Sequence, residues 1–211
     1  MISGIVGNNT RRPLDPSEFR GFALVDERAP IVFVNGADTK AAQMFTVAHE
    51  LAHVCLGQSA LSNIQPSSTP SPSNEVEAWC NRFAAELLVP IASLRKEYRS
   101  LAALPDELKR LARSFKVSTL VILRRLYDLK ALTKDQFRAA YEEELGRLTT
   151  YRPASGGNFY ATQASRVGER FARALVTSTF EGQTLYRDAF HLLGFKRIST
   201  FEKLANQLGV A

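Results

Sequence analysis

Cysteine, histidine and long apolar runs are scarce in this sequence of 211 residues. The two cysteines, Cys55 and Cys80, are too few for a disulfide framework and fit a reducing compartment. No apolar stretch approaches the roughly 20 residues that a membrane-spanning helix needs. The N-terminus also lacks the basic segment followed by an apolar one that marks a signal peptide. We therefore expect a cytoplasmic protein that does not associate with a membrane.

Charge is moderate in amount and unevenly distributed. Apolar residues make up 45% of the chain and charged residues 23%, which is typical of globular proteins. The net charge is −3 over residues 1–90 (six basic, nine acidic), +5 over residues 91–151 (13 and eight) and +4 over residues 152–211 (eight and four). This basic excess is compatible with a nucleic acid or an acidic partner, although a solvated basic face explains it more simply.

The first half of the chain predicts a loose N-terminal arm of about 15 residues, a hairpin and two helices. The β-type runs Phe22–Val25 and Ile31–Val34 form the hairpin. Apolar residues at near-helical spacing predict a helix over Lys40–Leu56, capped by Asp38 or Thr39. A second helix is expected over Glu75–Val89. Between the two helices, the prolines and serines of residues 58–74 predict a long connection without regular structure.

The second half is helical in pattern. Leu108–Phe115 and Thr119–Leu129, joined by a tight turn in which Ser118 is the second N-cap, predict a helix-turn-helix-like unit. The composition of Tyr151–Asn158 predicts a linker. The remaining tail predicts two or three short amphipathic helices, broken near Gly182 and Gly194.

The most specific motif is HExxH, formed by His49-Glu50-Leu51-Ala52-His53 inside the first predicted helix. Because an α-helix has 3.6 residues per turn, residues four apart share a face, so both imidazoles can reach one ion. Glu50 lies beside that face, where its carboxylate can act as the base that activates water. The alternative is a structural pair of core or capping histidines with a helix salt bridge.

A zinc site of this kind needs a third protein ligand, and the second predicted helix supplies candidates. We favour Glu77 over Glu75, because Glu77 shares a face with Asn81, which is placed to orient a ligand histidine. Cys80 is a further candidate ligand, although small core filler is the simpler interpretation. Cys55 is expected to face away from the metal, and His191 is expected to have a structural role.

These residues resemble a known family, the ImmA/IrrE-type zinc peptidases of bacteria and their mobile elements. The resemblance rests on FTVAHELAH (residues 45–53) and EAWCNRFAAELLVP (residues 77–90), is dense over residues 19–90 and is looser to about residue 145. It implies an α+β peptidase core in which His49, His53 and Glu77 bind zinc and Glu50 is the base. The long Ser/Pro connection departs from the family. Longer relatives carry an N-terminal DNA-binding domain, so this chain is expected either to lack that domain or to be a fragment.

We therefore predict an α+β fold in three parts: a zincin-like peptidase core with a small antiparallel or mixed sheet packed on the HExxH helix (1–92), a helical helix-turn-helix-like unit (93–150) and a helical tail (151–211). The resemblance implies intracellular cleavage of a specific protein, a helix-turn-helix repressor, with one Zn²⁺ per chain. The alternatives are a DNA-binding regulator with a structural metal, which would use residues such as Arg124 and Arg125, and a latent peptidase acting as a binding module. Tyr98 and Tyr160 are both open as donors to the oxyanion.

Overall fold

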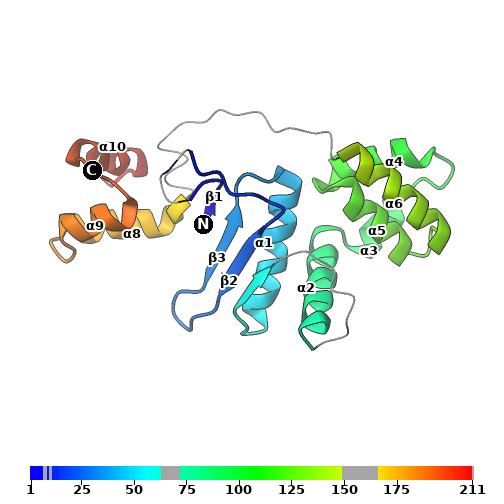
Figure 1. Cartoon of the computed structure of the whole chain (residues 1–211), viewed down its shortest axis with the longest axis horizontal. Coiled ribbons are helices and arrows are strands. Elements are labelled where there is room, and N and C mark those ends of the chain that lie inside the picture. Colours follow the sequence, from blue (N-terminus) through cyan, green and yellow to red (C-terminus); the bar gives the residue numbers. More distant parts are fainter. Residues whose placement is uncertain (7–8, 10, 63–71, 149–165, 211) are drawn as a thin grey trace.

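A mixed four-stranded sheet of order β1-β3-β2-β4 lies at the centre of the chain (Figure 1). The computed structural model describes residues 1–6, 9, 11–62, 72–148 and 166–210. Strand β2 (Gly21–Leu24) pairs antiparallel with β3 (Ile31–Asn35), which confirms the predicted hairpin. Strand β1 (Ile2–Ser3) pairs parallel with β3, so the prediction of a wholly loose N-terminal arm was wrong. A two-residue strand carries no periodicity, and only its pairing partner defines it.

Helix α1 (Lys40–Cys55) packs on β2 and β3 and begins at Thr39, whose side chain accepts a hydrogen bond from the Ala42 N–H. The helix was predicted from its apolar spacing, yet its buried face is largely polar. Buried polar side chains on α1 are Gln43, Thr46, His49, Glu50 and His53, while the apolar Met44 and Leu51 are exposed. Because burying polar groups is costly unless they are paired or functional, this face points to a site.

Helix α2 (Pro72–Leu88) packs against α1, and strand β4 (Ala60–Ser62) pairs antiparallel with β2. The prediction that residues 58–74 lack regular structure was therefore wrong at both ends of the segment. Proline is tolerated in the first helical turn, where its missing N–H would be unpaired in any case. The backbone of β4 forms hydrogen bonds with the edge of β2. A strand of three residues is too short for its pairing to be predicted from the sequence. Residues 63–71 lie outside the described part of the chain.

Helices α3 (Ile91–Glu97), α4 (Leu104–Phe115), α5 (Thr119–Asp128) and α6 (Lys134–Leu148) follow. The predicted helix-turn-helix-like unit is confirmed: Lys116 ends α4 in the left-handed conformation (φ 57°), and the Ser118 side chain caps α5 by accepting from the Val121 N–H. The buried core of this unit consists of Val89, Leu94, Leu108, Leu111, Ala112, Val117, Ile122, Leu123 and Leu126.

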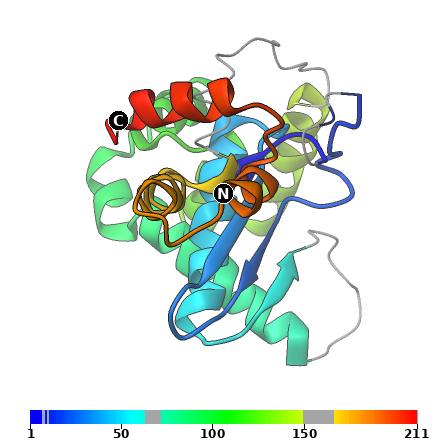
Figure 2. The ribbon, with the colours of Figure 1, turned by 90° about the vertical axis from the view of Figure 1, so that its left-hand side faces the viewer.

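Helices α8 (Glu169–Phe180), α9 (Tyr186–Leu193) and α10 (Ile198–Leu208) form the C-terminal end, with the expected breaks near Gly182 and Gly194. They share a separate buried core around Phe201, Leu193 and Val176. Figures 1 and 2 show them on the opposite side of the sheet from α4–α6. The predicted linker Tyr151–Asn158 lies outside the described residues, and the domain boundaries at 92 and 150 stay predictions.

The α+β fold class is confirmed, with the sheet packed on α1 and the other described elements helical. Among the residues that the structure describes, no helix combines the length and the apolar character needed to cross a bilayer.

Candidate metal centre

His49 and His53 lie one helical turn apart on the buried face of α1. Their Nε2 atoms are 3.2 Å apart, and the two residues are 5% and 1% exposed. Both rings therefore present the same nitrogen to one point, as the HExxH spacing predicts. Two imidazole nitrogens this close in a buried place need a shared proton or a cation between them.

Glu77 reaches the same point from α2. Its Oε2 lies 3.1 Å from His49 Nε2 and its Oε1 lies 3.1 Å from His53 Nε2. Ligand atoms of His49, His53 and Glu77 all lie within 4.8 Å of one another, and among the described residues this is the group that could hold a metal ion. Glu75, the alternative considered from the sequence, is not part of the group. The 39% exposure of the Glu77 side chain leaves one side of the group open to solvent.

The donor set fits a divalent zinc ion. In tetrahedral coordination with bonds of about 2.0–2.2 Å, neighbouring ligand atoms lie about 3.3–3.6 Å apart. The observed separations of 3.1–3.2 Å between the imidazole nitrogens and the carboxylate oxygens are close to that spacing. Two histidines and one carboxylate also form a ligand set of catalytic zinc sites, which keep a fourth position for solvent.

Asn81 holds the orientation of His49. Its Oδ1 lies 3.0 Å from His49 Nδ1, so the ring donates its Nδ1–H to the amide oxygen and leaves the Nε2 lone pair for a cation. Asn81 stands one turn after Glu77 on α2, which is the placement expected from the sequence. His53 Nδ1 is buried and has no hydrogen-bond partner among the described residues. The orientation of the His49 ring is therefore fixed by a hydrogen bond at Nδ1, whereas that of the His53 ring is not fixed by one at Nδ1 from the described residues.

Glu50 is fully buried, and its carboxylate lies against strand β2. A Cβ added to Gly21 would lie 3.2 Å from Glu50 Oε1 and 2.5 Å from the methyl group of Thr46. Gly21 therefore provides the space in which the Glu50 side chain packs between α1 and the sheet. The sequence contained this glycine, but only the packing of α1 on β2 reveals its contact with Glu50.

The local environment shifts three pKa values. Burial lowers the pKa of His53, which favours the neutral imidazole that binds metals, although the nearby Glu77 opposes the shift. Where no cation lies between the two side chains, hydrogen bonding with His49 is the main cause that lowers the pKa of Glu77. Burial raises the pKa of the Cys80 thiol to about 11, with further contributions from the Glu77 and Glu50 carboxylates.

The other residues considered from the sequence lie elsewhere. Cys80 is fully buried and outside the group of possible ligands, and Cys55 is exposed. His191 is exposed on α9, in the C-terminal helices. Tyr98 packs against the core of the α4–α6 unit. Tyr160 lies outside the described residues, so its proposed contact with the oxyanion stays a prediction.

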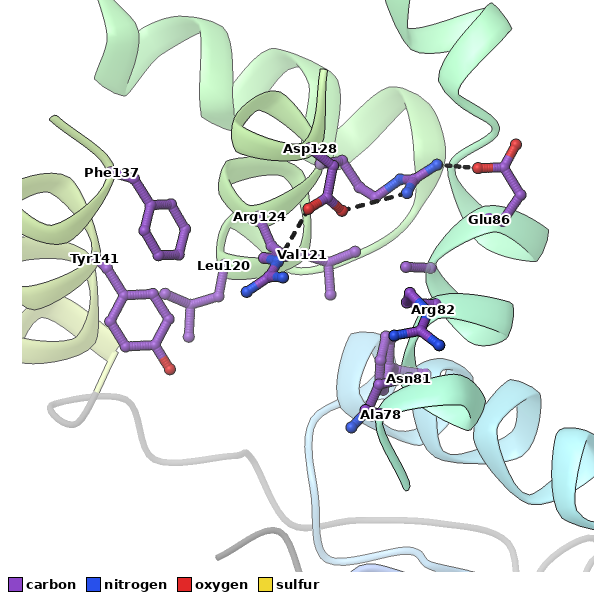
Figure 3. Close-up of a pocket in the computed structure, with 13 residues that line it drawn as sticks. Ala78, Asn81, Arg82, Glu86, Leu120, Val121, Arg124, Asp128, Phe137 and Tyr141 are labelled. Carbon is purple, nitrogen blue, oxygen red and sulfur yellow. Dashed lines mark hydrogen bonds and ion pairs between the residues drawn. The ribbon is translucent and has the colours of Figure 1, made fainter. Parts of the chain in front are cut away.

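A cavity of about 870 Å³ adjoins the candidate metal centre, between α1 and α2 on one side and α5 and α6 on the other (Figure 3). Phe45, Ala78 and Asn81 belong to its lining. Phe45 lies one helical turn before His49, Ala78 directly follows Glu77, and Asn81 lies one turn after Glu77. Arg82 and Tyr141, which also line it, were missed by the sequence analysis. Arg82 directly follows Asn81 and could have been noticed, whereas Tyr141 reaches the cavity only through the packing of α6.

Two arginines of the helix-turn-helix-like unit, Arg124 and Arg125, are engaged within the protein. Arg125 is 5% exposed, forms ion pairs with Glu86 and Asp128, and donates from Nε to the Val89 carbonyl at 3.0 Å. Arg124 pairs with Asp128 at 3.1 Å and lines the cavity. In this arrangement Arg125 has no reach toward a DNA duplex. The alternative prediction of DNA binding by the basic residues of this unit stays a prediction, with Arg125 unable to contribute to it in this arrangement.

The α+β fold and the HExxH helix with a carboxylate from the next helix are the features of a metallopeptidase-like protein. The sequence matches the IrrE N-terminal-like domain family of peptidases over residues 8–127, more than half of the chain. The chain therefore belongs to that family, and the resemblance inferred from the motifs is confirmed. Residues 167–207, which contain most of α8–α10, match a domain of unknown function (DUF8813). No curated protein and no solved structure was found to match the chain.

Proposed function

We propose that the protein is a zinc-dependent endopeptidase with one Zn²⁺ per chain, held by His49, His53 and Glu77. The convergence of these three side chains from two helices, beside the buried Glu50, is the observation that carries the proposal. Membership of a peptidase family also supports it.

Bound zinc would supply a Lewis acid that polarises the scissile carbonyl and lowers the pKa of water to about 7. The protein's own residues do the rest. Glu50 accepts a proton from the attacking water and returns it to the leaving amine, as a general base and then a general acid. Asn81 keeps His49 in the tautomer whose Nε2 is free to bind the ion. The open side of Glu77 and the adjoining cavity admit the peptide.

The substrate we propose is a specific cytoplasmic protein, a helix-turn-helix transcriptional repressor. The support is the family membership together with the restricted approach to Glu50, which is fully buried and suits a selective enzyme better than a broad one.

The test compares zinc-loaded wild-type protein with Glu50→Gln on a helix-turn-helix protein encoded by a neighbouring reading frame. We expect cleavage by the wild type and a decrease of about 10²- to 10⁴-fold in rate for Glu50→Gln at unchanged zinc content, because that is the usual contribution of a general base. Equal regulation of the target by the two proteins would exclude proteolysis as the mechanism.

A further inference from the structure

The cavity beside the metal centre is lined by residues of the metal-site helices α1 and α2 and by residues of α5 and α6. Ala78, Asn81, Arg82 and Ala85 come from α2, and Leu120, Val121 and Arg124 from α5, while Phe137 and Tyr141 come from α6. Phe45 lies one turn before His49 on α1, and their rings are 6.5 Å apart. The cavity thus begins one helical turn from His49 and at Asn81, whose side chain contacts the His49 ring, so it lies within reach of a peptide bound at the metal centre.

The acidic groups of the cavity are already paired. Glu86 and Asp128 both form ion pairs with the buried Arg125, and Asp128 is shared with Nε of Arg124. Since these carboxylates accept from arginines of the protein itself, they are poorly placed to bind a cationic substrate.

Two arginines retain donors that face the cavity. Arg82 is exposed and has no ion pair within the described part of the chain. Arg124 is 60% exposed, its Nε donates to Asp128, and its guanidinium carbon lies 5.7 Å from the centre of the Tyr127 ring, while its two terminal nitrogens have no ion pair or hydrogen bond with the described residues. Figure 3 shows their guanidinium groups in the space between α2 and α5. Guanidinium groups bind carboxylates through paired, charge-assisted hydrogen bonds.

We infer that Arg82 and Arg124 bind a carboxylate of the substrate peptide and thereby determine the specificity of cleavage. This inference rests on the proposed peptidase function. The carboxylate belongs either to an acidic side chain near the scissile bond or to the C-terminus of the peptide. The apolar walls formed by Leu120, Val121 and Phe137 leave these arginines as the main polar donors for it.

The experiment begins with digestion of a proteome-derived peptide library by zinc-loaded wild-type protein. The best-cleaved peptide is resynthesised with Glu, Gln or Lys at its preferred acidic position, and with a free or amidated C-terminus. We expect kcat/KM to fall about 10- to 100-fold on removal of the recognised carboxylate, the usual effect of losing a charged hydrogen bond. Whether Glu→Gln or amidation causes the fall identifies which carboxylate is bound.

Charge reversal in the protein provides the matched test. The variant Arg82→Glu/Arg124→Glu should reverse the preference from Glu to Lys, or lose the preference for a free C-terminus, while Arg113→Glu, on the exposed surface of α4, should behave as wild type. Zinc content and thermal unfolding of each variant verify that the fold is kept. An unchanged preference in the double variant, or cleavage without any preference for a carboxylate, overturns the inference and leaves the peptidase function standing.

Failure of the peptidase function has a different signature. If the wild type cleaves no peptide, the same library is passed over immobilised zinc-loaded Glu50→Gln. Enrichment of acidic or free C-terminal peptides that disappears with Arg82→Glu/Arg124→Glu would support carboxylate recognition without catalysis. Absence of such enrichment would overturn the recognition itself.

Discussion

Single residues around the metal centre hold their positions through specific contacts, and Asn81 is the clearest case. Its amide oxygen accepts from His49 Nδ1, whereas His53 Nδ1 has no such partner in the described chain. The Asn81→Ala variant should therefore lower zinc affinity about 10- to 100-fold. Competition titration with a fluorescent chelator measures this, with Asn206→Ala on the exposed face of α10 as the control. Equal affinities of Asn81→Ala and wild type would contradict the positioning role.

Gly21 is the second residue whose role follows from distances. Its Cβ would lie 2.5 Å from Thr46 Cγ2 and 2.7 Å from the Phe33 carbonyl oxygen, so Gly21→Ala should destabilise the fold by about 1–3 kcal/mol. Chemical denaturation measures the loss. Thr46→Ser in the same chain should recover part of it, because it removes the methyl group but leaves the carbonyl.

Gly146→Ala is the matched control for this crowding. Among the described residues, a Cβ at Gly146 in α6 meets no heavy atom within 4 Å apart from its chain neighbours and the backbone of its own helix, so alanine should be neutral or stabilise the helix. If Gly21→Ala and Gly146→Ala change the free energy of unfolding equally, the close packing of β2 on α1 is not the reason that position 21 requires glycine.

At the scale of elements, α4 ends at Lys116, whose backbone conformation is unfavourable for a residue with a side chain. Lys116 has φ 57° and ψ 35°, and a side chain in this left-handed region is strained, whereas glycine is not. Lys116→Gly should raise the free energy of unfolding by about 0.5–1 kcal/mol. The control is Lys109→Gly in the body of the same helix, which should lower it by about 1 kcal/mol. Urea denaturation measures both, and a loss of stability in Lys116→Gly would refute the argument.

The start of α4 is tied to the end of α3 by a titratable group. Hydrogen bonds from Arg110, and less strongly from the Arg99 N–H, hold the pKa of the buried Glu107 below its ordinary value despite the opposing effect of burial. A carboxylate with a lowered pKa stabilises the fold above the ordinary glutamate range, and that stability is lost as the pH falls through the lowered pKa.

Glu107→Gln should therefore show a smaller loss of stability than wild type when the pH falls from neutral to below the ordinary glutamate value of 4.5. Denaturation curves at a series of pH values provide the measurement, with the exposed Glu143→Gln as the control. Parallel pH profiles for wild type and Glu107→Gln would show that this carboxylate does not contribute.

At the scale of the whole molecule, the described chain contains separate hydrophobic cores that the metal should affect differently. Zinc would join α1 to α2, next to the core of the α4–α6 unit, while the core of α8–α10 consists of C-terminal residues alone. Calorimetry should therefore show that chelation lowers the melting temperature of one transition by several degrees, since a ligand at 100 times its Kd stabilises by about 2.7 kcal/mol.

The second transition, assigned to α8–α10, should not move on chelation. A variant with His49→Ala and His53→Ala should lose the sensitivity to chelator altogether, which separates metal binding from nonspecific effects of the chelator. A uniform shift of all transitions would mean that the cores unfold as one cooperative unit.

The sequence by itself determined the local features of this protein: the spacing of His49 and His53 on one helix, the placement of Glu77 and Asn81 on one face of the next helix, the hairpin, and the Ser118 cap of the helix-turn-helix-like unit. These depend on residues close together in the chain, whose periodicity and chemistry are visible in the letters. Tertiary structure alone decided the pairing of β1 and β4, the contact of Gly21 with Glu50, the burial of Arg125, and the cavity that joins Asn81 to Tyr141. Those features depend on which surfaces meet in space, and strand pairing and helix packing between distant segments leave no periodic trace in the sequence.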